Sequence, residues 1–214
     1  KNIRFNSNDC RPNDIFFAIN GTNSNGNSYI KKAIINGAKV IVSNLNFKGF
    51  DKNKILYLKS NNPRKLLSKV ASNYYNKKPK NIIAVTGTNG KTSIANFYYQ
   101  ILTLNNKNVA TIGTLGVYSK NLNFKTNNTT IDPVNIHRIL KNLYDNKVKN
   151  VILEASSHGL KQHRLNEINF RTALFTNLSR DHLDYHKTFK DYLNSKLILF
   201  NKLLIKKDNI IFDN

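Results

Sequence analysis

The sequence predicts an α/β protein of two domains, a small first domain and a second domain with a mostly parallel sheet. Three observations predict this class. Short β-branched segments alternate with amphipathic segments, the order that places helices on a parallel sheet. Residues 76–80, rich in lysine and containing a proline, interrupt the alternation as a linker. An apolar strand then runs through a glycine-bracketed turn into a helix. We therefore predict domains over residues 1–79 and 80–214.

Composition indicates a globular chain. With 214 residues, 40% hydrophobic and 21% charged, it is long enough to bury a core. No apolar run approaches the ~18 to 20 residues of a membrane span, and the first residues lack the apolar core of a signal peptide. The single cysteine, Cys10, excludes a disulfide framework and suits a reducing compartment. We therefore expect a soluble, cytoplasmic protein with no membrane partner.

The formal net charge of +22 invites a nucleic-acid partner, but the pattern of charges argues against one. The lysines are spread along the chain among Asn and Ile, arginine is scarce, and no basic motif is interleaved with base-stacking aromatic residues. A coding bias toward Lys, Asn and Ile explains the charge more simply. We expect no nucleic-acid partner.

The two ends of the sequence suggest a trimmed piece. There is no methionine at any position, and residues 209–214 form an apolar, strand-like run with nothing after it to pack on. We expect a fragment, in which any activity that needs later segments is missing.

The first domain is predicted to hold three strands and two helices. The strands are expected at residues 14–19, 39–43 and 55–58. Helical spacing of apolar residues predicts a helix over 29–36, which Gly37 ends. A second helix begins at Pro63 with Asn62 as its N-terminal cap and runs to about residue 75.

The second domain is predicted to alternate strands and helices. Strands are expected at residues 82–86, 109–114, 150–154 and 172–176, and helices at 91–104, 133–146 and 188–204. In such a sheet, ligands bind at the carboxyl ends of the strands. Three polar groups of residues follow these ends.

The turn after the first of these strands is typical of a phosphate-binding loop. It reads Thr86-Gly-Thr-Asn-Gly-Lys-Thr92, with Val85 where the general pattern has its first glycine. The two glycines let backbone N–H groups approach an anion at a helix N-terminus. Lys91 is expected on the terminal phosphates and the Thr92 hydroxyl on Mg²⁺. The loop is predicted to bind a nucleoside triphosphate.

Two polar segments follow other strands. Glu154 leaves an apolar strand beside the phosphate loop, where it could bind Mg²⁺ or be a solvated loop carboxylate. Residues 177–186 contain Asp and His side chains that could be metal ligands, helix caps or polar loop residues. Spacing alone does not choose among these alternatives.

Lys196 lies on the last predicted helix, beside its apolar stripe. The stripe consists of Phe189, Leu193, Leu197, Phe200, Leu203 and Leu204. A lysine on its flank either extends its amine to solvent along its stem or has a function. A buried amine is easily deprotonated and would react with CO₂ to give a carbamate able to bind Mg²⁺.

Together these motifs resemble the Mur ligase family, from about Phe5 to the end of the chain. The resemblance rests on Thr86–Thr92, Asn128-Thr-Thr130, Glu154-Ala-Ser-Ser-His-Gly-Leu160 with Gln162-His-Arg164, and Asn177-Leu-Ser-Arg-Asp-His-Leu-Asp-Tyr-His186. The first motif is shared with folylpolyglutamate synthases. The later motifs are more specific to the Mur ligases that add a diamino acid. The matching regions are the family's N-terminal domain and the first part of its central ATPase domain.

The resemblance implies roles for individual residues. ATP would bind at Gly87, Thr88, Asn89, Gly90, Lys91, Thr92 and Ser93. Thr92, Glu154 and His182 would place Mg²⁺, and Lys196 matches the family's carbamoylated lysine, so that Lys91, His182 and Lys196 are the implied catalytic residues. The muramoyl-dipeptide part of the substrate would contact Asn128, Thr129, Thr130, Ser156, Gln162 and Arg164. The UDP end would contact Ser7, Thr22, Asn23 and Ser24, although Asn6-Ser7-Asn8 stands where the family usually has Asp-Ser-Arg.

The implied reaction is ATP-dependent amide formation in peptidoglycan biosynthesis, by a monomer. ATP would phosphorylate the D-glutamyl γ-carboxylate of UDP-N-acetylmuramoyl-L-alanyl-D-glutamate, and the amine of meso-diaminopimelate or L-lysine would displace phosphate from the acyl phosphate.

Two alternative functions stay open. One is a folylpolyglutamate synthase-type ligase, which would lack the N-terminal domain. The other is an inactive nucleotide-binding fragment, because the family's C-terminal domain, which binds the incoming amino acid, is absent from this sequence.

Overall fold

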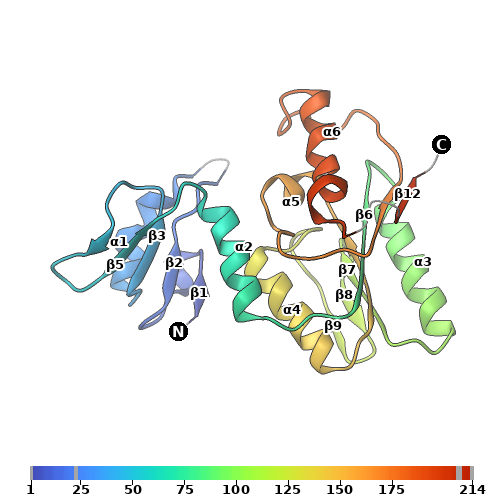
Figure 1. Cartoon of the computed structure of the whole chain (residues 1–214), viewed down its shortest axis with the longest axis horizontal. Coiled ribbons are helices and arrows are strands. Elements are labelled where there is room, and N and C mark those ends of the chain that lie inside the picture. Colours follow the sequence, from blue (N-terminus) through green and yellow to red (C-terminus); the bar gives the residue numbers. More distant parts are fainter. Residues whose placement is uncertain (1, 22–23, 206–208, 213–214) are drawn as a thin grey trace. The chain divides into compact units, whose positions relative to one another are not determined.

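The computed structural model describes residues 2–21, 24–205 and 209–212, which form two compact units, Lys1–Ala71 and Ser72–Asn214 (Figure 1). The unit boundary falls within helix α2, Pro63–Tyr74, slightly before the predicted boundary at residue 79. Both units are α/β, as the sequence predicts. None of the helices in the described ranges is both long and apolar enough to cross a membrane.

The first unit contains a five-stranded sheet in the order β1-β2-β3-β5-β4. The strands are β1 Ile3–Arg4, β2 Ile15–Phe17, β3 Val40–Ser43, β4 Gly49–Phe50 and β5 Leu56–Lys59. All neighbouring pairs are parallel except β4 with β5. The three predicted strands are confirmed as β2, β3 and β5. The two-residue strands β1 and β4 were not predicted, because two residues show no periodicity.

Both predicted helices of the first unit are confirmed. Helix α1, Ile30–Ile35, follows a 3₁₀ turn at Gly26–Tyr29 and ends before Gly37, whose φ of +103° suits glycine. Helix α2 begins at Pro63, and the Asn62 side chain accepts a hydrogen bond from the Lys65 amide at 2.9 Å. The core of this unit contains apolar side chains from the sheet, α1 and the connecting loops, among them Phe16, Ile41, Ala33 and Cys10.

Asp14 is a buried carboxylate in the first unit, with 1% of its surface exposed. It accepts hydrogen bonds from the Asn2 amide at 2.8 Å, the Arg4 guanidinium at 3.0 Å and the Arg11 amide at 3.1 Å. Burial alone would raise the pKa of Asp14, but these three donors outweigh burial and hold its pKa below the usual value. Asp14 therefore fixes the start of the chain to the loop before β2.

The second unit contains a seven-stranded sheet in the order β12-β11-β6-β10-β7-β8-β9. The strands are β6 Asn81–Thr86, β7 Val109–Gly113, β8 Gly116–Ser119, β9 Leu122–Phe124, β10 Asn150–Glu154, β11 Thr172–Phe175 and β12 Ile210–Phe212. The five strands from β12 to β7 run parallel, and β8 and β9 add an antiparallel edge. The predicted parallel sheet is confirmed, and the antiparallel edge was not predicted.

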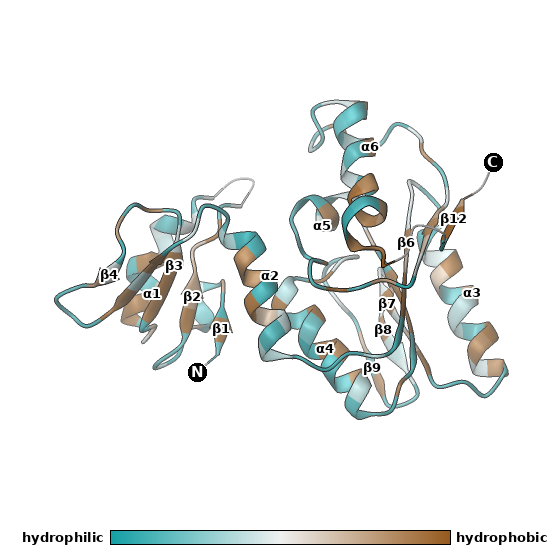
Figure 2. Ribbon diagram, viewed as in Figure 1, coloured by the Kyte–Doolittle hydropathy of each residue, from teal (hydrophilic) through white to brown (hydrophobic). Residues whose placement is uncertain are grey.

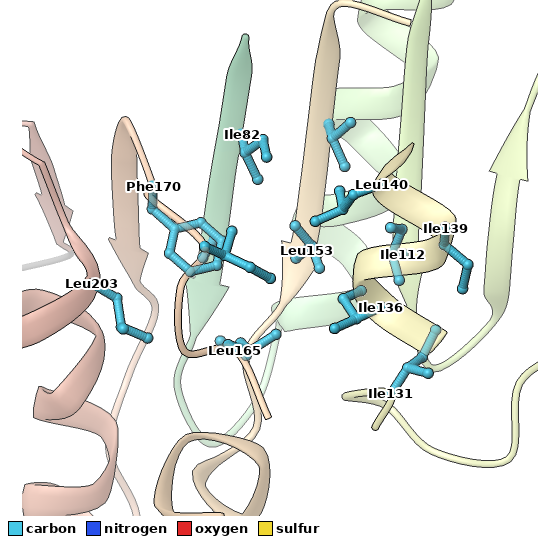
Figure 3. Close-up of a cluster of buried hydrophobic side chains, with 14 of the residues drawn as sticks. Ile82, Ile112, Ile131, Ile136, Ile139, Leu140, Leu153, Leu165, Phe170 and Leu203 are labelled. Carbon is cyan, nitrogen blue, oxygen red and sulfur yellow. The ribbon is translucent and has the colours of Figure 1, made fainter. Parts of the chain in front are cut away.

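Helices cover both faces of this sheet (Figure 1). They are α3 Lys91–Leu104, α4 Pro133–Asp145, α5 Ser157–Lys161 and α6 Phe189–Ile198, which continues into a π-helical turn at Leu199–Leu203. Helix α3 packs Ala95 against Val85 and Ile152 on one face. Helix α4 packs on the other face in a larger aliphatic cluster (Figure 3), and the strands are the most apolar part of the unit (Figure 2).

The predicted helix over 188–204 is confirmed only in part. Thr188 caps α6, but the α-helix ends at Ile198 and the π-helical turn follows. The buried positions of α6 are Tyr192, Ser195 and Lys196, followed by Leu199. The predicted apolar stripe, by contrast, includes Phe189, which is 41% exposed. The buried face is polar because it lies against the phosphate loop, which apolar periodicity cannot reveal.

Candidate functional site

The phosphate loop connects β6 to α3 at the carboxyl edge of the sheet. Gly87 and Gly90 have φ values of +146° and +81°, and Gly90 is the N-terminal cap of α3. A Cβ atom at Gly87 would collide with the Thr176 side chain, so only glycine fits there. The loop therefore places backbone N–H groups at the positive end of a 14-residue helix, which is an arrangement suited to anions.

The segment after β11 holds this loop in place. The Thr88 amide donates to the Asn177 carbonyl at 3.0 Å, and the Asn89 amide donates to the Asn177 side-chain oxygen at 2.9 Å. The Thr176 hydroxyl donates to the Asn89 carbonyl at 2.6 Å. Sequence reasoning placed 177–186 at the site but gave Asn177 no role. Its position directly after a strand was the only available signal.

Lys91 folds back onto its own loop. Its Nζ donates to the Gly87 carbonyl at 2.8 Å and to the Thr88 carbonyl at 2.7 Å. Burial lowers the pKa of Lys91, against the opposing attraction of Glu154 and Asp181. The amine is thus held at the centre of the loop, where a phosphate bound by the loop would lie beside it.

Glu154, at the carboxyl end of β10, is buried beneath the loop with 2% of its surface exposed. Oε2 accepts from the Thr92 hydroxyl at 2.8 Å and from the Thr114 hydroxyl at 3.1 Å, and Oε1 accepts from the Thr114 amide at 2.9 Å. The alternative of a solvated loop carboxylate is therefore wrong. Thr114 was not predicted as a site residue, although it follows the carboxyl end of β7.

Lys196 is 1% exposed, so the alternative that it extends its amine to solvent is also wrong. Its Nζ donates to the Gly87 carbonyl at 2.6 Å and lies 4.3 Å from the centroid of the Tyr192 ring. Burial, together with the nearby positive charge of Lys91, lowers the pKa of Lys196 to about 7. The environment of this amine therefore favours its neutral, nucleophilic form more than that of an exposed lysine does.

Tyr192 connects Lys196 to the loop. The residue is fully buried, and its hydroxyl lies 3.0 Å from the Thr88 Oγ1. The same Oγ1 accepts a hydrogen bond from the Ser179 amide at 3.0 Å. Sequence reasoning missed Tyr192. The signal that could have found it is its position four residues before Lys196, on the same face of the helix.

One cavity of about 260 Å³ brings most of the predicted residues together. Its lining includes Thr88, Asn89, Gly90, Lys91, Thr92, Ser93, Thr129, Glu154, Ser156, His182 and Lys196. Gly87 belongs to the same loop. His182 has a φ of +52° and a side chain that is 48% exposed, and its ring packs edge-on against His158 at 4.9 Å between centroids. His158 was in a quoted motif but was not predicted as a site residue.

Four of the six residues expected to hold the muramoyl-dipeptide form a connected polar network: Thr130, Ser156, Gln162 and Arg164. Thr130 Oγ1 donates to the Glu154 carbonyl at 2.9 Å and accepts from the Ser156 amide and hydroxyl, each at 2.9 Å. Arg164 donates to the Thr130 carbonyl at 2.7 Å and to the Gln162 side-chain oxygen at 2.8 Å. The network thus joins the loop before α4 to the cap of α5. Asn128 lies apart from it and lines a different cavity, of about 270 Å³.

The residues expected at the UDP end lie in the first unit. Ser7 is buried at the start of a 3₁₀ turn, Ser7–Asp9, and its carbonyl accepts from the Asn36 side chain at 2.9 Å. The Ser24 carbonyl accepts from the Gly21 amide at 2.8 Å. Thr22 and Asn23 lie outside the described residues. The role of these four residues stays a prediction.

The donors at the phosphate loop fit Mg²⁺ better than a metal that needs an all-protein site. Within residues 2–21, 24–205 and 209–212, no cluster of three or more His, Cys, Asp or Glu could hold a metal ion. The Thr92 hydroxyl and the Glu154 carboxylate are hard oxygen donors 2.8 Å apart. Mg²⁺ commonly takes one or two such donors and completes its shell with water and substrate phosphates.

Comparison with known families and sequences identifies the family to which the chain belongs. Residues 85–214 match the model of the Mur ligase middle domain. A UDP-N-acetylmuramoyl-L-alanyl-D-glutamate–2,6-diaminopimelate ligase of Rickettsia montanensis is 42% identical over 209 residues, which is 95% of this chain and 43% of that protein. The ligase of the same name from Clostridium tetani is 41% identical over 213 residues, covering 98% of this chain and 44% of that protein. The chain thus spans less than half the length of the curated relatives it matches.

Solved structures agree with the fold. A structure of a UDP-N-acetylmuramoyl-L-alanyl-D-glutamate–2,6-diaminopimelate ligase aligns with a TM-score of 0.79 at 29% identity, over 95% of this chain and 41% of that one. The MurF ligase of Thermotoga maritima, solved in complex with ADP, aligns with a TM-score of 0.60 at 22% identity, over 94% of this chain and 43% of that one. At that identity the second comparison shows a shared fold alone.

Proposed function

The chain belongs to the Mur ligase family, and on that premise we propose that it forms the substrate- and ATP-binding part of a MurE-type ligase. Such an enzyme joins a diamino acid to UDP-N-acetylmuramoyl-L-alanyl-D-glutamate in peptidoglycan biosynthesis. One observation carries the proposal: Lys91, Thr92, Glu154 and Lys196 converge on a single loop and line one cavity. The relatives named above act with 2,6-diaminopimelate, which makes it the proposed diamino acid.

The first task of the site is to bring two anions together. The carboxylate to be activated and the triphosphate repel one another, so a positive, preorganised surface is needed. The loop amides and the N-terminus of α3 supply partial positive charge, and Lys91 supplies a full charge. In the proposed reaction Lys91 leaves the loop carbonyls and contacts the phosphoryl group as it moves to the γ-carboxylate of the D-glutamyl residue.

Thr92 and Glu154 would hold Mg²⁺ on the phosphate side of the cavity, with His182 also on its lining. When bound, the ion neutralises charge on the phosphates. The Thr92–Glu154 hydrogen bond keeps both oxygens directed at one place before any ion binds. Thr114 supports this arrangement, because its amide and hydroxyl both donate to the same carboxylate.

Lys196 is proposed to act as a carbamate. The neutral amine that its environment favours adds to CO₂ and releases one proton, and the product is an anionic oxygen ligand in place of a cation. A second anionic group near the loop would support a second metal position. The burial of the amine also supports this role, because a carbamate shielded from water loses CO₂ less readily.

The substrate carboxylate would approach from the side of Thr129, Ser156 and Arg164. Arg164 is held in place by the Thr130 carbonyl and by Gln162, whose Nε2 donates to the Tyr185 hydroxyl at 3.1 Å. A guanidinium fixed in this way recognises a carboxylate with defined geometry. We propose that this network orients the dipeptide so that its γ-carboxylate points toward the phosphate loop.

Calorimetric titration of UDP-N-acetylmuramoyl-L-alanyl-D-glutamate into the chain tests the proposal, with dihydropteroate as the comparison ligand. We expect saturable binding of the nucleotide sugar alone. Binding of dihydropteroate instead would favour a folylpolyglutamate synthase-type ligase. Binding of neither, with retained MgATP binding, would leave only a nucleotide-binding fragment.

A Lys91→Ala variant of the complete ligase tests the chemistry. Acyl-phosphate formation should fall by about 10³-fold or more, because the charge that offsets the repulsion between the two anions is lost. Lys107→Ala, which removes an exposed lysine just after α3, is the matched control and should leave the rate unchanged. Turnover retained by Lys91→Ala would overturn the assignment.

A further inference from the structure

A second cavity lies against the phosphate site, between α3 and the β7–β8 hairpin. Its volume is about 280 Å³. Its lining consists of Thr92, Ala95, Asn96 and Tyr99 from α3, Thr111, Gly113, Leu115, Gly116 and Tyr118 from the hairpin, and Glu154. The helical residues are spaced three and four apart, so they form a single face of α3. The cavity shares only Thr92 and Glu154 with the phosphate site, and neither the family resemblance nor the proposed reaction gives it a ligand.

The sequence of the hairpin explains why this space is left. Alternate residues of a strand face opposite sides of the sheet. Ala110, Ile112 and Val117 face the aliphatic cluster around α4. On the face beneath α3, Thr111 pairs with Tyr118, and Gly113 pairs directly with Gly116 across the hairpin. The glycine pair carries no side chain where a core face would have apolar ones, so the gap follows from these two residues.

Both glycines are required by close contacts, which makes the gap a fixed feature of the fold. A Cβ atom at Gly113 would collide with the Glu154 carboxylate, and one at Gly116 would collide with the Phe124 carbonyl. Gly116 also has a φ of +125°, which disfavours other residues. At the two glycines the cavity is therefore bounded by backbone and by the Glu154 carboxylate.

The chemistry of the lining points to one class of ligand. Two phenol rings, Leu115 and Ala95 provide apolar surface, as in small-molecule pockets that bury a ring. Among the described residues that line the cavity, Glu154 alone has a formally charged side chain. Its two oxygens accept three hydrogen bonds within the chain, whereas a carboxylate offers about four acceptor positions. One position is left for a donor.

We propose that this cavity is a second ligand site, which binds a small, flat aromatic ring carrying a cationic N–H donor, such as an aryl amidine. The donor takes the free acceptor position of Glu154, and the ring lies against the tyrosine-lined wall. The binding of such a ligand is independent of the proposed ligase activity. Its effect on the neighbouring phosphate site rests on that proposed function.

The expected effect of such a ligand on the phosphate site follows from the Glu154 carboxylate, which both cavities share. A cation bound to Glu154 from the hairpin side competes with Mg²⁺ for the same negative charge, so the two ligands should weaken each other. By thermodynamic linkage the factor is the same in both directions, and we expect it to be about fivefold or more. The cavity would then regulate metal and nucleotide binding.

Benzamidine is the probe, followed by ¹⁵N amide NMR on the whole chain. We expect saturable shifts at the amides of Gly113, Gly116 and Tyr118, with Kd on the order of 1 mM for a ligand of this size. Benzoate, which has the same ring and the opposite charge, should not bind there. The net charge of +22 favours benzoate at any unspecific position, so preference for benzamidine would be diagnostic.

Two variants locate the binding. Thr111→Ile fills the floor of the cavity, and Leu115→Trp fills its mouth from a side chain that is 52% exposed and remote from the core. Each should abolish the benzamidine shifts while the rest of the spectrum is retained. Thr172→Ile in β11 is the matched control and should bind like the parent chain. Shifts absent at 10 times the expected Kd (about 10 mM), or shifts that survive both variants, would overturn the proposal.

Magnesium tripolyphosphate tests the coupling, because it occupies the phosphate loop but has no ring to compete for the cavity. We expect it to weaken benzamidine binding by the factor given above, with a reciprocal loss of its own affinity. Benzamidine binding without any mutual effect would overturn the regulatory part. Failure of tripolyphosphate to bind would count against the proposed function and leave the benzamidine result unaffected.

Discussion

The two units each bury a charged side chain, and the two charges are treated in opposite ways. Asp14 in the first unit has three donors, and its pKa is lowered, so the charged form is the favoured one. Lys196 in the second unit donates to a single carbonyl, lies near Lys91, and has its pKa lowered to about 7, so its charge is disfavoured. A satisfied charge stabilises a fold, whereas an unsatisfied one is a reactive group. Burial alone therefore does not distinguish structure from function, but the partners do.

Of the changes that test this contrast, substitution of Lys196 has the largest expected effect. In the complete ligase, Lys196→Ala should lower turnover by about 10³-fold, since the proposed carbamate and the metal position it supports are both lost. Added acetate should restore part of the rate by occupying the vacated space with a carboxylate. Equal loss with and without acetate would contradict the carbamate role.

The Lys196 side chain should not contribute to the free energy of unfolding. Lys196→Met keeps most of the side-chain volume and removes a charge that the folded state disfavours, so the free energy of unfolding of the chain should stay the same or rise. Denaturant titration measures this. A loss of more than about 2 kcal/mol would show that Lys196 is structural and would remove the contrast with Asp14.

Asp14→Ala should have the opposite result, a loss of stability with no direct effect on the phosphate site. It leaves two backbone amides and the Arg4 guanidinium without their acceptor at a partly buried site, which should cost about 2 to 4 kcal/mol in denaturant titration. Asp14→Asn retains one acceptor oxygen and should cost less. Because the pKa of Asp14 is lowered in the folded state, its contribution is present above about pH 4 and is lost as the pH falls through the folded pKa. A loss for Asp14→Ala no larger than that for Asp14→Asn would contradict this account.

His137 tests whether the charge state of a buried group depends on its hydrogen-bond partners or on the unit in which it lies. It lies in the second unit, fully buried on α4, with Nε2 3.2 Å from the Asn166 carbonyl and no partner for Nδ1 among the described residues. Burial, then the nearby charge of Lys78, lowers the pKa of His137 to about 4. Unfolding raises it to about 6.5, so the unfolded chain binds more protons between these values. Stability should therefore be complete above about pH 6.5 and fall by about 3 kcal/mol on the way to about pH 4.

The matched variant is His137→Phe, which keeps a buried ring and cannot titrate. The difference between the two unfolding curves across this pH range isolates His137 from the carboxylates and from the other histidines. If the parent chain and the variant showed the same pH dependence, water would have to reach the buried ring in the folded state. The comparison between paired and unpaired buried groups would then have to count water as a partner.

Much of the fold followed from local sequence signals, and the misses have physical causes. The phosphate-loop motif placed the start of α3, Lys91–Leu104, and an apolar run placed β10, Asn150–Glu154, and both predicted ranges agree with the structure. The strands of the antiparallel edge begin at Gly116 and are short, so they show no clear period. Helix α5 has only five residues, and its Ser156 cap appears in the sequence as one more polar residue.

The location of a site residue could be predicted where the residue belongs to a sequence motif. Its burial and its contacts could not, where they depend on tertiary packing. The loop and Glu154 could be placed by their positions after strands. The burial of Glu154 and Lys196 could not, because it depends on Thr114 and on the rotation of α6, which long-range packing sets. Apolar periodicity does not identify the buried face of α6, because that face is polar and lies against the phosphate loop.

Tyr192 gives the smallest and most specific effect, because its two contacts can be removed separately. Tyr192→Phe deletes the 3.0 Å contact with Thr88 and keeps the ring beside the Lys196 amine. Loss of one buried hydrogen bond should cost about 1 kcal/mol and raise the Kd for MgATP by about fivefold, while the reactivity of Lys196 is unchanged. Tyr192→Leu also removes the ring, whose face favours the cationic form of the amine, so the pKa of Lys196 should fall further. Amine-selective labelling against pH separates the two variants. If both shift the labelling profile equally, the hydroxyl and not the ring tunes the amine, and Tyr192 belongs with Asp14 as a hydrogen-bonding support.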